Sequence, residues 1–267
     1  LVWFTEGVCR FLAQELALEF GLISAEEFAS ELNAVLGIQA VLSQPRYTAR
    51  CLASASTAER EPAASAPTAK EPPHSCSVLQ LARGALHATE LENALRAQGS
   101  SLVTLLARLL ASEKVLLAPN VWLDALRAAG GPLAVRSEEE FSRGRPLLLP
   151  SAAFGPCFTR ERARYPESSL GLPVELGAEQ LPWTVTNLDP SSPAFAAGLR
   201  PGAIVRAIEH VPYDAERPIR LWLADGSRIE YLGPRQLVPS HAWKRVPGVH
   251  EALCRMSGRQ PRRPPRP

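Results

Sequence analysis

The stretch that decides the fold of the C-terminal half is VTNLDPSSPAFAAGLRPGAIVRAIEHVPYD, residues 185–214. It predicts a strand over 185–188 and, after a turn, a short helix that Ser192 caps and Pro193 opens. A glycine ends this helix, a Pro-Gly pair makes a tight turn, and a second strand follows over 204–208. This order of elements predicts a small β-rich domain.

Short alternating runs of apolar and polar residues lie on both sides of this stretch. Such runs, broken by frequent prolines and glycines, are typical of strands. The sequence ADGS, residues 224–227, separates two of them and predicts a hairpin turn with Asp-Gly at its centre. The predicted strands are GLPVEL (171–176), WTVTNL (183–188), AIVRAIEH (203–210), IRLWLADG (219–226) and RIEYLG (228–233).

Residues 185–214 resemble the bacterial form of the PDZ domain, whose motif runs SPA..AGL.pGD.I..I.G. This resemblance implies that a peptide binds as an added strand, while a loop of backbone N–H groups holds its terminal carboxylate. Leu170, Gly171 and Leu172 occupy the position of that loop, so peptides or protein C-termini are the implied partners. The matching residues are Ser192, Pro193, Ala194, Ala197, Gly198, Leu199, Pro201, Gly202, Ile204 and Ile208.

Some features depart from the PDZ pattern. Ala203 replaces the usual aspartate, and Glu209-His210 replaces the usual Asn-Gly. The family also has a helix that forms the second wall of the peptide groove. Here only YDAERP, residues 213–218, precedes the strand that begins at Ile219. The domain is therefore expected either to bind peptides or to serve only as a packing module.

The N-terminal half is patterned as helices. From Glu6 to Phe20 apolar residues recur at helical spacing, and Gly21 follows, where a glycine commonly ends a helix. Ser24 and Glu27 form a capping box that starts the next helix. Further helices are predicted from SVLQLARGALHATELENALRAQ (77–98), SLVTLLARLLAS (101–112) and NVWLDALRAAGG (120–131), the last of them ended by its paired glycines.

These patterns divide the chain into parts. We predict a helical domain over 1–150, a PDZ-like domain over 160–234 and a C-terminal extension over 235–267. Residues 55–75, rich in Ala, Ser and Pro, predict a flexible insertion within the first domain. The extension ends in RQPRRPPRP, residues 259–267, which cannot form a core and is expected to be disordered.

Net charge and hydropathy limit the partners that we expect, and the cysteine spacing predicts the state of the thiols. The formal net charge of +2 gives no general attraction to nucleic acid, so nucleic acid is not expected as a partner. No run of apolar residues is long enough for a membrane span, so none is expected. Because the cysteines are scattered and no C-x-x-C occurs, we expect isolated reduced or buried thiols at Cys9, Cys51, Cys76, Cys157 and Cys254.

The start of the chain carries a second resemblance. LVWFTEGVCRFLAQELALEFGLIS, residues 1–24, resembles a helix of the glycyl aminopeptidase family of zinc metallopeptidases, gluzincins that carry a C-terminal PDZ domain. LARGALHATELENALRA (81–97) and FSRGRPLLLP (141–150) resemble later segments of that family. The matching residues at the start are Leu1, Trp3, Phe4, Glu6, Gly7, Gly21, Leu22, Ile23, Ser24 and Glu27.

The resemblance implies a fold. We expect a multidomain α+β protein, in which the α-helical C-terminal half of a thermolysin-like catalytic domain is followed by a small β-rich PDZ-like domain.

The same resemblance implies a zinc site. Glu6 occupies the position of the third zinc ligand, and in the family the other two ligands are histidines of an H-E-x-x-H helix. That motif does not occur in this sequence, and in the family it precedes the segment that contains the glutamate. The chain starts at Leu1 without a methionine, so we expect that residues upstream are missing. Zinc is expected as a cofactor only if the upstream histidine helix exists.

A further departure concerns catalysis. In the family a tyrosine hydroxyl stabilises the oxyanion of the tetrahedral intermediate, and its position here is Leu81, which has no donor. Two hypotheses follow. The chain is either a divergent zinc metallo-aminopeptidase, which hydrolyses peptides from the N-terminus but is inactive as it stands, or a non-catalytic PDZ-like scaffold that binds peptides or proteins.

Overall fold

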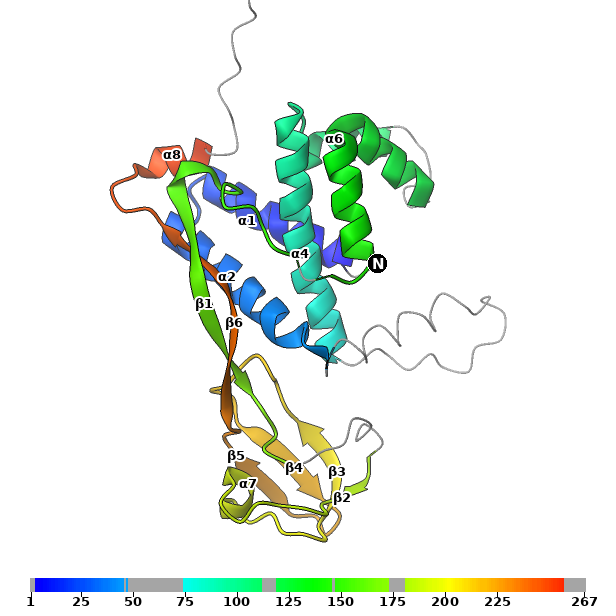
Figure 1. The fold of residues 1–267 in the computed structure, drawn as a ribbon, viewed down its shortest axis with the longest axis vertical. Helices are drawn as coiled ribbons and strands as arrows, with labels where there is room; N and C mark the ends of the chain where they lie inside the picture. The colour runs from blue at the N-terminus through cyan, green and yellow to red at the C-terminus, as the bar shows by residue number, and fades with distance from the viewer. Residues whose placement is uncertain are drawn as a thin grey trace, which may run out of the picture. The chain divides into compact units, whose positions relative to one another are not determined.

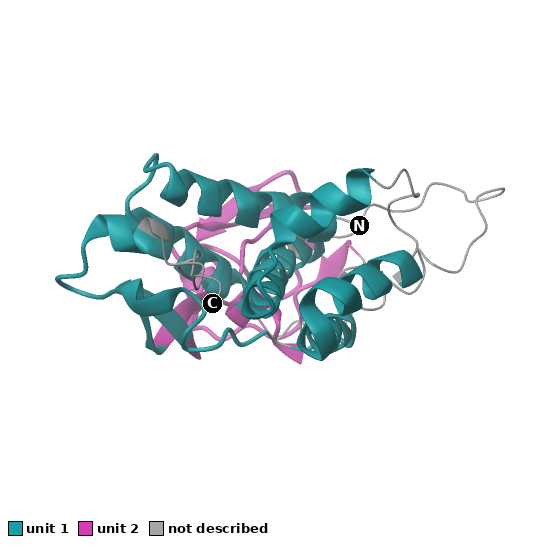
Figure 2. Ribbon diagram, turned by 90° about the horizontal axis from the view of Figure 1, so that it is seen from above, with its two compact units in different colours: residues 1–39, 72–162, 241–267 teal, residues 40–71, 163–240 magenta. Residues whose placement is uncertain are grey.

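A computed structural model describes the molecule as a mixed α+β protein with two compact units (Figures 1 and 2). Unit 1 comprises residues 1–39, 72–162 and 241–267, and unit 2 comprises 40–71 and 163–240. The structure describes residues 3–45, 47, 74–111, 119–145, 147–172 and 181–256.

Two sequence predictions fall mainly outside these described residues. The predicted insertion at 55–75 lies outside them except for its last two residues, which begin a helix. The predicted disordered tail at 259–267 lies outside them entirely.

Unit 1 is built mainly from helices. A π-helical turn, η1 (Trp3–Val8), runs directly into α1 (Cys9–Glu19). The other helical elements are α2 (Ala25–Leu42), α4 (His74–Ala97), α5 (Leu102–Ala111), α6 (Pro119–Ser142), the short η2 (Gly155–Cys157) and α8 (Glu251–Met256). No helix among the described residues is long and apolar enough to cross a membrane.

The ends of the first helices follow from local chemistry. Gly21 has φ of 68°, and the Leu22 N–H donates to the carbonyl of Ala17 at 2.8 Å, which closes the end of α1. The Ser24 N–H donates to Glu27 Oε2 at 2.7 Å, and the Glu27 N–H donates to Ser24 Oγ at 3.2 Å. The predicted helix end and the predicted capping box are both confirmed.

Helix α6 is broken near its middle. Gly131 has φ of 63° and ψ of −159°, outside the helical range, and Pro132 follows it. The paired glycines therefore interrupt the helix where the sequence predicts its end. A second helical segment continues to Ser142 and was not predicted; Pro132 stands at its start, where the missing N–H of proline is tolerated.

Unit 2 contains a four-stranded antiparallel sheet in the order β2-β3-β4-β5. Its strands are β2 (Trp183–Thr184), β3 (Ile204–Glu209), β4 (Ile219–Leu223) and β5 (Arg228–Tyr231). The predicted strands at 203–210, 219–226 and 228–233 and the Asp-Gly hairpin are confirmed. The predicted strand at 183–188 is a strand only in its first two residues, and most of 171–176 lies outside the described residues.

A separate pair of long strands was not predicted. β1 (Phe158–Ser168) pairs with β6 (Arg235–Arg245) as a two-stranded sheet. The division into units passes through both strands, so each unit contains a part of this pair.

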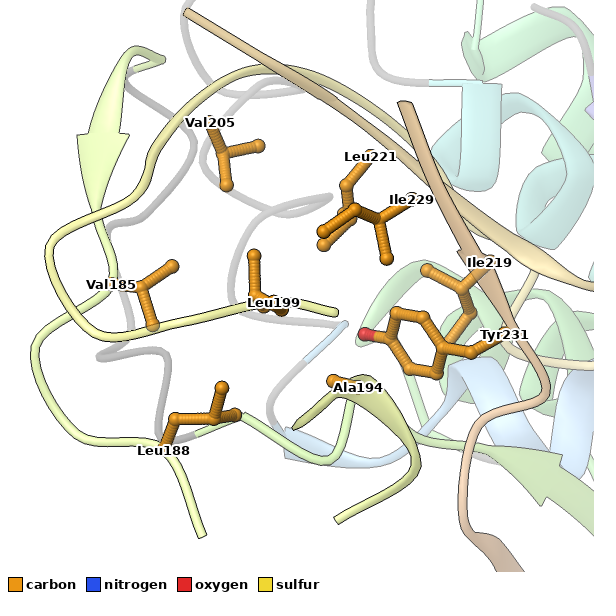
Figure 3. Close-up of a cluster of buried hydrophobic side chains, with 9 residues drawn as sticks. All are labelled: Val185, Leu188, Ala194, Leu199, Val205, Ile219, Leu221, Ile229 and Tyr231. Carbon is orange, nitrogen blue, oxygen red and sulfur yellow. The ribbon is translucent and has the colours of Figure 1, made fainter. Parts of the chain in front are cut away.

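The short helix α7 (Pro193–Ala196) packs beside the sheet of unit 2 as the sequence predicts. Ser192 Oγ accepts the Phe195 N–H at 3.2 Å, and Pro193 stands at the first helical position. Figure 3 shows the side chains of the resulting core, which come from the strands, from α7 and from the loop segments before and after α7. This core consists of Val185, Leu188, Ala194, Leu199, Val205, Ile219, Leu221, Ile229 and Tyr231.

The cysteines differ from the sequence prediction. Cys157 and Cys254 form a disulfide, and Cys76 is also disulfide-bonded, whereas Cys9 is free and exposed. The prediction of isolated thiols is wrong for Cys76, Cys157 and Cys254, holds for Cys9, and for Cys51 falls outside the described residues. Its basis was sequence spacing, but the fold of unit 1 brings together two cysteines that are 97 residues apart.

Candidate functional site

The structure places Glu6 on η1, at the start of unit 1. Its carboxylate is exposed, while the next two residues, Gly7 and Val8, are buried. A π-helical turn of this kind is rare, and such turns are frequent at functional sites. The sequence-predicted ligand candidate is therefore accessible, and its neighbours anchor it to the core.

Gly7 joins η1 to α4 through direct backbone contact. A Cβ added to Gly7 would lie 2.7 Å from Gly84 Cα, and a Cβ added to Gly84 would overlap the carbonyl oxygen of Trp3. Glycine is thus required on both sides of the contact. The contact joins two of the three segments that carry the peptidase resemblance, one with Glu6-Gly7 and the other with Arg83-Gly84.

Leu81 lies on α4 and is partly buried, three residues before the contacting glycine. Its side chain offers no hydrogen-bond donor. Arg83, two residues further on, donates to the carbonyls of Phe141 and Gly144 at 2.8 and 3.0 Å. Its guanidinium therefore caps the end of α6 and lies over the Phe141 ring.

A buried polar network lies between α4 and α6, and the sequence did not reveal it. His87, fully buried, donates from Nε2 to Glu138 Oε2 at 3.0 Å, because a carboxylate only accepts. Trp122 Nε1 donates to the same oxygen at 2.8 Å. The ring of His87 stacks on Phe141 with centroids 4.2 Å apart, and Trp3 packs against both rings.

The pKa values of two carboxylates in this network are shifted in opposite directions. Burial alone would raise the pKa of Glu138, but the hydrogen bond and charge of His87 and the Trp122 N–H outweigh it and lower this pKa. Burial raises the pKa of Glu90, and a hydrogen bond from Ser137 Oγ at 2.9 Å offsets only part of that effect. The network holds α6 on α4, and its enclosure keeps His87 from reaching a substrate.

The described residues do not by themselves form a zinc site. Among them, no group of three or more His, Cys, Asp and Glu side chains is placed to hold a metal ion. A catalytic zinc takes three protein ligands, and this part of the chain offers Glu6 alone. We therefore derive no catalytic step through zinc.

The loop predicted to hold a carboxylate lies at the edge of the core of unit 2. Gly171 has φ of 63°, and Leu170 and Leu172 pack against the core. Tyr231 Oη donates to the Leu170 carbonyl at 2.8 Å, and the Ser169 N–H donates to the Pro234 carbonyl at 3.0 Å. These bonds fix the start of the loop.

This loop carries three consecutive backbone N–H groups. Those of Leu170, Gly171 and Leu172 donate to no acceptor among the described residues. A run of N–H groups around a positive-φ glycine is a common way to bind an anion. The carboxylate-binding role that the resemblance implies for this loop stays a prediction.

The second wall of a PDZ groove has no helical counterpart here. The described segment 210–218 between β3 and β4 consists of turns and contains no helix. It is held by Asp214, whose N–H donates to the Val211 carbonyl at 3.1 Å, and by a hydrogen bond from Arg217 to Glu209 at 2.5 Å.

We compared the sequence with protein-family models and with curated proteins. The sequence matches no protein-family model, and no curated protein matches it.

Proposed function

We propose that this chain is a divergent relative of the glycyl aminopeptidases that works as a peptide-binding scaffold and not as a peptidase. The observation that carries the proposal is the loop Leu170–Leu172: its two leucines pack against the core of unit 2, and its backbone N–H groups donate to no acceptor among the described residues. Its partners are peptides or protein C-termini with a free carboxylate.

The contact between Gly7 and Gly84 supports the proposed ancestry. Each glycine belongs to one of the two segments that resemble the peptidase family, and each contact excludes a side chain. A chance resemblance of two separate segments would not require them to pack together in this way.

Leu81 supports the loss of catalysis. Loss of one oxyanion donor lowers the rate of an acyl-transfer enzyme by roughly a hundred- to a thousandfold. Among the described residues, no group of three or more His, Cys, Asp and Glu side chains is placed to hold a metal ion. Binding through the PDZ-like unit needs neither feature.

The experiment is a titration of the full chain with a short peptide that ends in an apolar residue, with the C-terminus either free or amidated. We expect saturable binding of the free acid and at least tenfold weaker binding of the amide. Gly171→Ala should weaken binding, because the added Cβ would lie 2.9 Å from the Pro234 ring and the loop would have to shift.

Gly226→Ala is the matched control. Gly226 also has a positive φ, of 86°, but it lies in the β4–β5 hairpin, where an added Cβ meets nothing within 4 Å. It should cost stability without changing affinity. Equal binding of acid and amide, or equal effects of the two substitutions, would contradict the proposal.

A zinc aminopeptidase is the second candidate, and the exposed carboxylate of Glu6 on η1 favours it. It predicts one zinc ion per chain that is lost in Glu6→Ala but kept in Glu31→Ala, a change at another exposed glutamate. Elemental analysis after dialysis, together with release of N-terminal residues from a reporter peptide, separates the two candidates.

A further inference from the structure

The disulfide of unit 1 is enclosed. Cys157 is the last residue of the short η2 segment and Cys254 lies on α8, and these two residues are 0% and 1% exposed. Their Cα atoms are 5.1 Å apart, within the usual range for a disulfide. The bond links two parts of the chain that are separated by 97 residues.

This disulfide fixes the end of β6 and the start of α8. The Val246 N–H donates to the Cys157 carbonyl at 2.8 Å. Asn33, on α2, exchanges two hydrogen bonds with the backbone of Trp243, at 2.9 and 2.7 Å. The C-terminal part of unit 1 is thus bound to α2 through Trp243 and to η2 through Val246.

Helix α8 in turn completes the start of α2. Glu251 Oε1 accepts the Ala25 N–H at 2.8 Å, which satisfies one open donor of the α2 N-terminus. Arg245 pairs with Glu26 at 2.6 Å and with Glu251 at 3.2 Å. Because α8 has only six residues, it is too short to be stable in isolation and depends on its attachments.

We infer that Cys157–Cys254 is a structural cross-link that forms as the chain matures in an oxidising compartment. Closing the bond removes two electrons and two protons from the two thiols. The disulfide of a thiol–disulfide oxidoreductase accepts them and leaves as a dithiol. Cys76 is disulfide-bonded as well, which also supports an oxidising compartment. Structural disulfides persist where thiols are kept oxidised.

Burial distinguishes this cross-link from a reversible switch. An attacking thiolate must reach a sulfur atom, and both sulfurs lie inside unit 1. Reduction in the native state therefore requires α8 to open first. Cys9, which is free and exposed, is the accessible thiol in the same unit.

The first test is mass spectrometry of the full chain, denatured with a thiol-blocking reagent and digested without reductant. Protein matured in an oxidising secretory compartment should yield the peptide that links residues 157 and 254 in stoichiometric amount. Recovery of blocked, unlinked peptides at both positions would overturn the inference.

The second test is the melting temperature. Cys157→Ala/Cys254→Ala should melt roughly 5–15 °C lower than the unchanged chain, because the cross-link closes a long loop. Reductant should lower the melting temperature of the unchanged chain to that of the double variant. Cys9→Ala, the control, should shift it by no more than about 1 °C.

Equal melting temperatures of the double variant and the unchanged chain would overturn the structural role of the Cys157–Cys254 disulfide. If the double variant does not fold, the effect of reductant on the unchanged chain decides the question. A melting temperature that reductant leaves unchanged while both thiols become free would then overturn it.

Discussion

Gly7 and Gly84 lie in backbone contact, and neither position can accept a side chain without displacing the other segment. The contact fixes η1 against α4. It places the element that carries Glu6 beside the element that carries Leu81.

Gly84→Ala should destabilise unit 1 strongly. The new methyl group would overlap the Trp3 carbonyl, so η1 would have to move, at an expected cost of about 3 kcal/mol. Gly99→Ala is the control: its φ of 74° is strained for alanine, but the added atom meets nothing. That change should cost about 1 kcal/mol. Denaturant unfolding measures both, and equal costs would show that the glycine contact is not tight.

Glu138→Gln should destabilise the chain by about 2–4 kcal/mol at neutral pH, because it leaves His87 without a charged partner in a buried site. The folded-state pKa of Glu138 is lowered, so its contribution is complete above the unfolded value near 4.5. The contribution is lost as pH falls through the lowered pKa, so the difference between variant and unchanged chain should shrink below pH 4.

Glu139→Gln is the neighbouring control for this prediction. Glu139 is exposed and pairs with Arg143 at 3.4 Å, so its loss should cost no more than about 0.5 kcal/mol. Unfolding curves recorded across the acid range test both variants. A loss of unfolding free energy in Glu138→Gln that does not change with pH would contradict the lowered pKa of Glu138 in the folded state.

Tyr231→Phe should loosen the Leu170–Leu172 loop. Burial raises the pKa of Tyr231 well above its usual range, so its hydroxyl stays protonated and keeps donating to the Leu170 carbonyl. Losing that bond should cost about 1 kcal/mol of stability and weaken peptide binding severalfold. Tyr213→Phe is the control, since the Tyr213 hydroxyl donates to no partner among the described residues. Unchanged affinity in Tyr231→Phe would mean that the loop does not bind the peptide.

Leu81→Tyr should not create peptidase activity in this chain. A restored hydroxyl can multiply an existing rate, but it cannot supply the zinc ligands that the described residues lack. The measurement is release of N-terminal residues from a reporter peptide with added zinc. Measurable release by the variant would favour the enzyme hypothesis.

Much of the local structure could be predicted from the sequence because it depends on near neighbours. The Ser24–Glu27 capping box, the Ser192 cap and the Asp-Gly hairpin all use residues within three positions of one another. Their side chains and turn preferences are nearly independent of the rest of the fold.

The strands β1 and β6 could not be predicted in the same way. β1, with the sequence FTRERARYPES, is rich in charge and has no clear alternation of apolar residues. Its partner, β6, lies far along the chain, so the pairing depends on contacts that no local pattern records.

The residues of the candidate site also differ in whether the sequence could predict them. Glu6, Leu81 and the Leu170–Leu172 loop were found by resemblance, and the structure shows where each lies. His87 was not found, because its role depends on Glu138 and Trp122 on another helix. The Cys157–Cys254 bond was missed for the same reason.

The most direct test of the proposed function is a calorimetric titration of the full chain with one peptide in two forms, with a free or an amidated C-terminus. We predict saturable binding of the free acid, loss of at least tenfold in affinity for the amide, and recovery of the peptide intact. Equal affinity for both forms, or a peptide shortened from its N-terminus, would contradict the scaffold proposal.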